Sequence, residues 1–191
     1  MSKFNAYHFT GSTLRDGRPV PAIGETLIHD GPIVWCESGL YASRTAWEAL
    51  HYAPGPMLHR VWCEDVEMEE GDKLVCRRRT IVASIDATHL LRRFAADQAL
   101  SVAHLWDMPD VVREYLTTLD ETKRPAATWA AWAAAWAASA REAAWAARET
   151  ARAASAWEAA RAASAWGLAR LARPNEAAAD FNARVDVAFA A

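Results

Sequence analysis

Short runs of alternating apolar and polar residues, separated by glycine, proline and aspartate, fill the first 87 positions of the chain. A period of two is typical of half-buried β-strands, and the intervening residues favour tight turns. One helix is expected over residues 44–51, with Ser43 as its N-cap and Pro54 close behind its end. The pattern predicts a small α+β domain over residues 1–87. Its strands are expected at residues 3–10, 22–29, 33–36, 58–67, 73–76 and 80–86.

From Thr88 onward the apolar positions recur every three or four residues, which is the period of an amphipathic α-helix. A first helix is predicted over residues 88–106, with its apolar side chains near one face. A second is predicted over residues 109–119, where Pro109 lies in the first turn and its missing N–H removes no hydrogen bond. Residues 88–124 are therefore expected to form an amphipathic helical pair.

The segment from Ala126 to Arg173 consists almost entirely of alanine, tryptophan, arginine, glutamate and serine. Alanine is the strongest helix former, and one unbroken helix here would be about 70 Å long at ~1.5 Å per residue. Such a helix is too long for a small domain, so we expect it either to fold into a hairpin or to be buried between neighbours. A last short helix is expected from Asn175, which makes residues 125–191 an all-α, Ala/Trp-rich region.

The tryptophans of this segment indicate burial on more than one side. At ~100° per residue, the first three of them share one face of a helix. The hexapeptide RAASAW occurs twice, nine residues apart, which places its two tryptophans on opposite sides. The alternative is a solvated helix produced by compositional drift, which would expose apolar rings to water. We predict oligomerisation through six tryptophans, Trp129, Trp132, Trp136, Trp145, Trp157 and Trp166.

Composition narrows the classes of function. The chain has 191 residues and a net charge of −3, which argues against a general binder of nucleic acid or of membrane surfaces. Its three cysteines form no C-x-x-C pair and no secretory signal is recognisable, so we expect a cytoplasmic protein. No apolar run is long enough to cross a bilayer, and no membrane association is expected.

Several motifs of known chemistry are missing from the sequence. The six histidines are scattered, without H-x-x-x-H or H-E-x-x-H spacing, so no metal site is predicted. There is neither a G-x-x-x-x-G-K-S loop nor a G-x-G-x-x-G turn, which disfavours phosphate-loop chemistry. A G-x-S-x-G nucleophile elbow is also missing. We therefore expect no cofactor.

Histidine, hydroxyl and aromatic residues gather in three short stretches, YHFT, CESGLYAS and ALHY. Side chains of these kinds beside a glycine turn are able to hold a nucleotide or ribose by stacking and hydrogen bonding. The alternative is that these residues belong to the hydrophobic core of a small domain, with their polar groups at the edge of that core. The sequence also leaves open whether the run Arg77–Arg79 binds anions or is a solvated strand edge. The predicted ligand-binding residues are His8, Thr10, Ser38, Tyr41 and Tyr52.

The stretch CESGLYA at residues 36–42, with GET upstream and DKL downstream, resembles a family of small phage and bacterial domains of unknown function. That family has a C-x-S-G-[Phe/Leu]-[His/Tyr]-A core followed by a helix and a tyrosine, and the resemblance covers residues 4–86. Residues 99–120 and the alanine-rich tail resemble C-terminal extensions of phage and actinobacterial members. Tyr41 stands where many members carry histidine, and Ser43 where many carry a second cysteine. The resemblance implies a phage or prophage origin.

A second resemblance is to ADP-ribosyltransferase-like folds. Those folds use a histidine or arginine on the first strand, a G-x-Tyr strand and a late catalytic glutamate. His8 and Tyr41 match the first two positions, and the resemblance would assign the third to Glu64, Glu67 or Glu69. It implies binding of NAD by an enzyme.

The combined prediction is a non-enzymatic, oligomeric binding protein of phage origin. Its α+β domain, or pockets between protomers, would capture a nucleotide-like ligand or a host protein, as a host-defence antagonist does. The alternatives are the NAD-using enzyme and a structural phage protein whose function lies in the tail helix.

Overall fold

The computed structural model describes residues 3–137, 148 and 174–191. The chain divides into two compact units, one formed by Met1–Ala87 together with Asn182–Ala191 and the other by Thr88–Phe181. A five-stranded antiparallel sheet and several helices confirm the mixed α+β class. The inclusion of Asn182–Ala191 in the first unit was not anticipated from the sequence.

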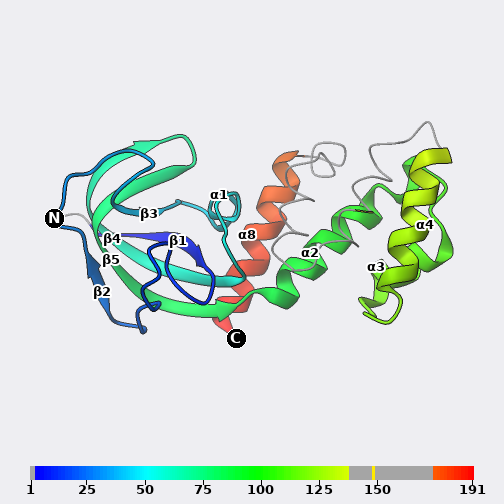
Figure 1. Ribbon diagram of the computed structural model, residues 1–191, viewed down its shortest axis with the longest axis horizontal. Coiled ribbons are helices and arrows are strands. Elements are labelled where there is room, and N and C mark those ends of the chain that lie inside the picture. The colour runs from blue at the N-terminus through cyan, green and yellow to red at the C-terminus, as the bar shows by residue number, and fades with distance from the viewer. Residues whose placement is uncertain (1–2, 138–147, 149–173) are drawn as a thin grey trace. The chain divides into compact units, whose positions relative to one another are not determined.

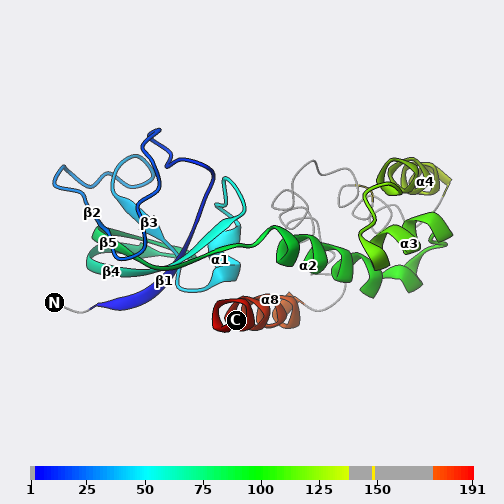
Figure 2. The same ribbon diagram turned by 90° about the horizontal axis from the view of Figure 1, so that it is seen from below.

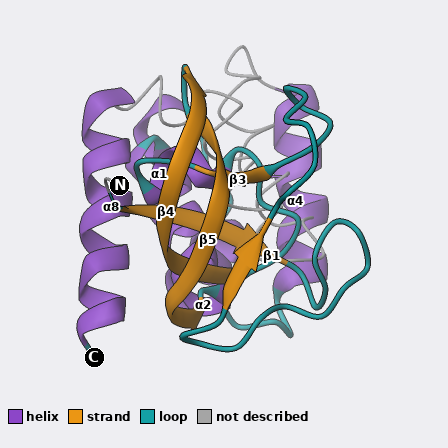
Figure 3. Cartoon of the chain, turned by 90° about the vertical axis from the view of Figure 1, so that its left-hand side faces the viewer, coloured by secondary structure: helices purple, strands orange, loops and turns teal. Residues whose placement is uncertain are grey.

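The sheet of the first unit is built around one long hairpin (Figure 3). Its strands are β4, Met57–Glu70, and β5, Lys73–Asp86, joined through Gly71. The strand order is β1-β4-β5-β2, and β3 also pairs with β5. The remaining strands are β1, Phe4–Thr10, β2, Thr26–Ile28, and β3, Leu40–Ala42. Every pairing is antiparallel, as expected for strands joined by turns and short loops.

Three of the predicted strands need correction. Residues 73–76 and 80–86 are parts of a single strand, because Arg77–Arg79 continue the β5 ladder in spite of their charge. Residues 33–36 form a turn instead of a strand, closed by backbone hydrogen bonds from Glu37 and Ser38 to the Val34 carbonyl. The strand in this region is β3, which begins directly after Gly39.

Helix α1, Ala46–Leu50, begins two residues later than expected because Thr45, and not Ser43, is its N-cap. Thr45 Oγ1 accepts a hydrogen bond from the Glu48 amide, and the Glu48 carboxylate accepts one from the Thr45 amide. This reciprocal capping box satisfies two amides at once. The backbone of Ser43 exchanges two hydrogen bonds with Tyr7 instead, at 2.8 and 2.9 Å, and so extends the pairing beyond β3.

Part of the first unit comes from the end of the chain. Within helix α8, Pro174–Ala190, the Asn182 side chain accepts a hydrogen bond from the Trp47 amide at 2.9 Å. Asp186 forms an ion pair with Arg60 of β4 at 2.7 Å, and the Arg60 guanidinium also lies 4.6 Å from the Phe189 ring centroid. These contacts attach the C-terminal residues to β4 and α1.

The second unit is helical in its described part. It contains α2, Thr88–Ser101, a 3-10 turn at Ala103–Leu105, α3, Asp110–Thr118, and α4, Arg124–Ala137. Helices α3 and α4 lie side by side in both views (Figures 1 and 2). The two predicted amphipathic helices are therefore present, the first ending earlier than expected. None of the helices in the described ranges is apolar enough over sufficient length to cross a bilayer.

The Ala/Trp tract is described only at its beginning. Helix α4 carries Trp129, Trp132 and Trp136; the Trp129 side chain is 69% exposed and Trp132 is 38% exposed. The rings of Trp129 and Trp132 make an edge-to-face contact with centroids 5.6 Å apart. The predicted positions Trp145, Trp157 and Trp166, and with them the choice between one helix and a hairpin, lie outside the described residues.

Candidate functional site

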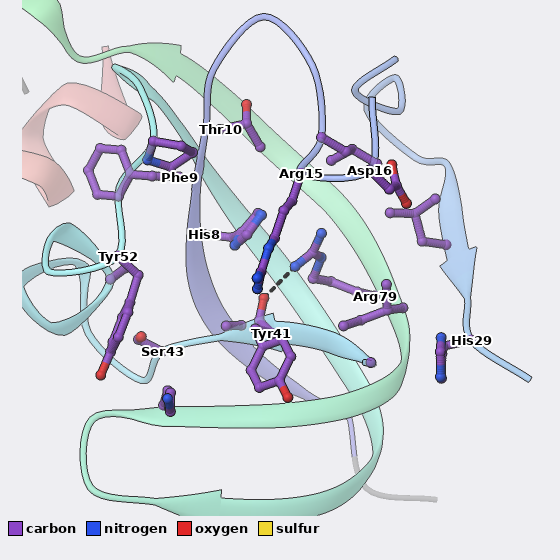
Figure 4. Close-up of a pocket in the computed structure, with 18 of the residues that line it drawn as sticks. His8, Phe9, Thr10, Arg15, Asp16, His29, Tyr41, Ser43, Tyr52 and Arg79 are labelled. Carbon is purple, nitrogen blue, oxygen red and sulfur yellow. Dashed lines mark hydrogen bonds between the residues drawn. The ribbon is translucent and has the colours of Figure 1, made fainter. Parts of the chain in front are cut away.

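A pocket of about 970 Å³ lies in the first unit, against the sheet. All five residues predicted to bind a ligand line it, brought together from separate parts of the chain: His8 and Thr10 from β1, Ser38 from the loop before β3, Tyr41 from β3 and Tyr52 from beyond α1. Figure 4 shows His8, Tyr41 and Tyr52 around the same space. Strand β5 completes the lining with residues that lie far along the sequence from these five.

Two of the predicted hydroxyl groups hold the loop before β3 in place. Tyr41 Oη accepts a hydrogen bond from the Cys36 amide at 2.7 Å and has the Val34 and Ser38 carbonyls at 3.2 and 3.3 Å. Ser38 Oγ donates to the Pro32 carbonyl at 2.6 Å and accepts from the Val34 amide at 2.9 Å. These hydroxyls shape the pocket wall, and the one O–H donor of each is already used within the protein.

The other two hydroxyls are also engaged. Tyr52 Oη donates to Asp72 at 2.5 Å, which is the first cause of the raised pKa of Tyr52. Thr10 Oγ1 donates to the Gly11 carbonyl at 3.0 Å and lies 2.9 Å from His59 Nε2. The hydroxyls of Thr10 and Tyr52 therefore also help to build the pocket, and direct contact of all four hydroxyls with a ligand stays a prediction.

His8 differs from the other four predicted residues. Its imidazole is half-buried in the pocket wall and makes no hydrogen bond within the part of the chain that the structure describes. Burial and the positive charge of Arg79, with a smaller contribution from His59, hold the pKa of His8 well below its usual range. His8 is thus a neutral, unpaired imidazole that lines the pocket near neutral pH.

Arg79 belongs to the arginine run that the sequence left open as an anion binder, but the sequence did not distinguish it from Arg77 and Arg78. Arg79 is 5% exposed, and one guanidinium N–H donates to the Tyr41 carbonyl (Figure 4). Among the described residues no carboxylate lies within ion-pairing distance of this guanidinium. Burial lowers the pKa of Arg79, as expected for a cation removed from water without a counter-charge. A buried arginine facing a pocket in this state is well placed to receive an anion.

The three consecutive arginines have different roles. Arg77 pairs with Glu67 at 2.6 Å and Arg78 with Glu64 at 3.7 Å, and both side chains are partly exposed. Arg79 alone of the three is buried and lines the pocket. The period of two in β5 places Arg79 two residues before the buried Ile81, but it places the partly exposed Arg77 on the same face, so this pattern alone does not identify Arg79.

Basic side chains outnumber acidic ones around the pocket. Its described lining includes Arg15, Arg18, Lys73 and Arg79, against Asp16 and Glu37. Asp16 is neutralised by Arg18 at 2.7 Å. Arg15, from the loop after β1, also lines the pocket, and its guanidinium lies 3.5 Å from the Cys36 carbonyl. The electrostatic potential of the pocket therefore favours a negatively charged ligand.

The glutamates that the ADP-ribosyltransferase resemblance would use lie elsewhere on the sheet. Glu64, Glu67 and Glu69 of β4 are not among the described residues that line the pocket. Glu64 and Glu67 are paired with arginines of β5, and Glu69 forms a bidentate pair with Arg44 at 2.6 and 2.7 Å. His8 and Tyr41 share the pocket, but a catalytic carboxylate from this set does not join them.

Acid is expected to destabilise the first unit through His59. This imidazole is 2% exposed, between Thr10 Oγ1 and Ser84 Oγ, and burial followed by Arg79 lowers the pKa of His59 to about 4. Because this pKa lies below the ~6.5 of an unfolded chain, stability is intact above about pH 6.5 and falls by about 3 kcal/mol as the pH approaches 4. Urea unfolding across this range should show that His59→Gln, which keeps a hydrogen-bonding side chain, loses clearly less stability. Equal losses in both proteins would contradict this assignment.

No group of three or more histidine, cysteine or acidic residues in the described ranges is arranged to hold a metal ion. The three cysteines are free thiols; Cys36 is exposed at the pocket and the other two are buried. Comparison of the chain with protein-family models, curated proteins and solved structures found no match. The pocket is therefore the feature of the described structure that bears on function.

Proposed function

We propose that the first unit is a non-catalytic binding module whose pocket takes a small phosphorylated, nucleotide-like molecule. The observation that carries the proposal is Arg79, a buried guanidinium that faces the pocket and has no carboxylate partner in the described structure. Removing such a charge from water is costly unless it is paired, and a bound anion would supply the missing charge.

A phosphoryl group suits this arrangement better than a neutral ligand does. Guanidinium groups bind phosphate oxygens through charge-assisted hydrogen bonds, and a second arginine, Arg15, also lines the pocket. The imidazole of His8 adds a nitrogen that the protein itself leaves unpaired. Three nitrogen-bearing side chains of this kind form a subsite for an oxyanion.

The rest of the pocket suits the ring portion of a nucleotide. The lining includes the aromatic residues Tyr41 and Tyr52, and the volume of about 970 Å³ is at the large end of small-molecule sites. The Lys73 ammonium lies 5.2 Å from the Tyr52 ring centroid and adds positive charge on that side. Aromatic faces of this kind hold planar bases by stacking.

A ligand panel tests the proposal directly. ADP, AMP, adenosine and pyrophosphate are added to the purified full chain, and thermal unfolding is followed. ADP and pyrophosphate are expected to raise Tm, by an amount equivalent to about 2.7 kcal/mol at a concentration one hundred times Kd, whereas adenosine is not. Failure of every phosphate-bearing compound to raise Tm, or an equal effect of adenosine, would refute it. NAD should be recovered intact, and its turnover would favour the enzyme.

Self-association through α4 is the second part of the proposal. The support for it is Trp129, a large apolar side chain that is 69% exposed beside the partly exposed Trp132. Analytical ultracentrifugation of the full chain is expected to show an oligomer that dissociates when both residues are replaced by alanine. A monomeric wild-type protein would exclude self-association, and the proposal that the pocket binds a ligand would still stand. With the phage resemblance, the whole molecule would sequester its ligand in the cytoplasm of a host cell.

A further inference from the structure

We propose that binding of an anion in this pocket takes up a proton at His8, so that the protein holds its ligand more tightly as the pH falls. This inference rests on the proposed function and adds the way in which the same site is regulated. It follows from where His8 lies relative to the two arginines and from the charges that surround it.

His8 and the arginines face the same space from three segments of the chain. His8 comes from β1, Arg79 from β5 and Arg15 from the loop after β1 (Figure 4). Of the two arginines, Arg79 is the one whose charge acts on His8, so an anion held by Arg79 would lie close to the His8 imidazole. That imidazole has no hydrogen-bond partner among the described residues, so it is available to donate to a bound oxyanion once it is protonated.

The charged groups of the described pocket lining around His8 are mostly cations, with two acids among them. His59 of β4, opposite His8 in the strand register, is engaged by Thr10 and Ser84, and Tyr41 of β3 is neutral. The cations of the described lining are Arg15, Arg18, Lys73 and Arg79. The two acids of that lining are Asp16, which is paired with Arg18, and Glu37, from the loop before β3.

A bound dianion would change this balance. In the empty pocket, burial and Arg79 keep the pKa of His8 low, and the imidazole is neutral at physiological pH. A dianion between the arginines offsets the charge of Arg79 and favours the imidazolium, which raises the pKa of His8 in the complex. A group with a higher pKa in the complex than in the free protein gains protons on binding, so affinity increases as the pH falls.

Sulfate is the first probe, because it stays a dianion throughout the range tested and any proton taken up belongs to the protein. Titration calorimetry of the full chain in two buffers of different ionisation enthalpy, at about pH 6 and about pH 8, gives the number of protons. The expected result is an uptake approaching one proton and an affinity that rises by up to about tenfold per pH unit. In His8→Gln, which cannot be protonated, both effects should disappear.

His104→Gln is the matched control, because His104 is an exposed histidine of the second unit and is not among the described residues that line the pocket. It should keep the proton uptake of the wild type. The titrations are repeated with ADP, which itself takes up protons in this pH range. Subtracting the proton uptake of His8→Gln from that of the wild type cancels the contribution of ADP. Binding without proton uptake, or uptake retained in His8→Gln, would overturn the inference and leave the proposed function standing. No binding of either probe would overturn both.

Discussion

Replacing Arg79 by methionine is expected to abolish tight binding of ADP while making the protein more stable. The guanidinium is 5% exposed and has no carboxylate partner in the described part of the chain, so it destabilises the free protein. Its removal should raise the free energy of unfolding by about 1 kcal/mol. This net gain includes the cost of the hydrogen bond that the Tyr41 carbonyl loses. The same change should weaken ADP binding by about 30- to 1,000-fold, because a phosphate would lose its buried cation.

Arg78→Met is the matched control for this experiment. Arg78 is the neighbouring arginine of the same strand, but it is on the surface, 3.7 Å from Glu64. Surface pairs of this kind contribute about 0–1 kcal/mol, so neither stability nor ADP affinity should change appreciably. Calorimetry gives the affinities and urea unfolding gives the free energies. A large loss of stability in Arg79→Met would show that this arginine is structural, and an unchanged affinity would remove it from the binding site.

Gly39→Ala is expected to be among the most destabilising substitutions in the first unit, at about 3–5 kcal/mol. Gly39 has φ of +116°, a conformation that L-residues rarely adopt, and it lies between the turn at residues 33–38 and strand β3. An added Cβ would overlap the Val75 side chain and lie 2.9 Å from Ile33 Cδ1. Val75 is fully buried in the sheet, so the clash cannot be relieved by a small movement of an exposed side chain.

Gly17→Ala separates the two causes of this loss. Gly17 also has positive φ, at +82°, but nothing lies within 4 Å of the position that a Cβ would take, so the substitution should cost only about 1 kcal/mol. The difference between the two variants, measured by urea unfolding, is the cost of the steric clash. Because Gly39 also lines the pocket, Gly39→Ala should weaken ADP binding as well. Similar stability losses in both variants would contradict the close packing of Gly39 on Val75.

The sequence predicts where most helices and strands of the first unit lie, but not which strands pair. Alternation identified β1 and most of β4, because each places apolar residues on one face against the core. It missed the continuity of β5, since three successive arginines interrupt the hydrophobic pattern on which strand prediction depends. The N-cap of α1 was misplaced by two residues because Ser43 and Thr45 are both suitable caps, and only the pairing of Ser43 with Tyr7 decides between them.

The grouping of the predicted residues around one pocket could be predicted from the sequence, but their hydrogen bonding could not. His8, Thr10, Ser38, Tyr41 and Tyr52 all line one pocket, which follows from their grouping in three aromatic and hydroxyl-rich stretches. Their hydroxyl groups, however, are bonded within the protein, and such bonding depends on loop geometry that no local pattern specifies. Arg79 was not distinguished from Arg77 and Arg78, because the pattern of β5 places Arg77 on the same face.

The central claim is that Arg79 receives the anionic part of a bound ligand, and NMR of arginine side chains tests it most directly. The Nε–H resonance of Arg79 is assigned in the ¹⁵N-labelled full chain by its loss from the spectrum of Arg79→Met, and ADP is then titrated into the wild type. We predict that this resonance shifts and saturates with the Kd found by calorimetry, while that of Arg78 stays in place. ADP binding that leaves the Arg79 resonance unmoved, or no binding at all, would contradict the account.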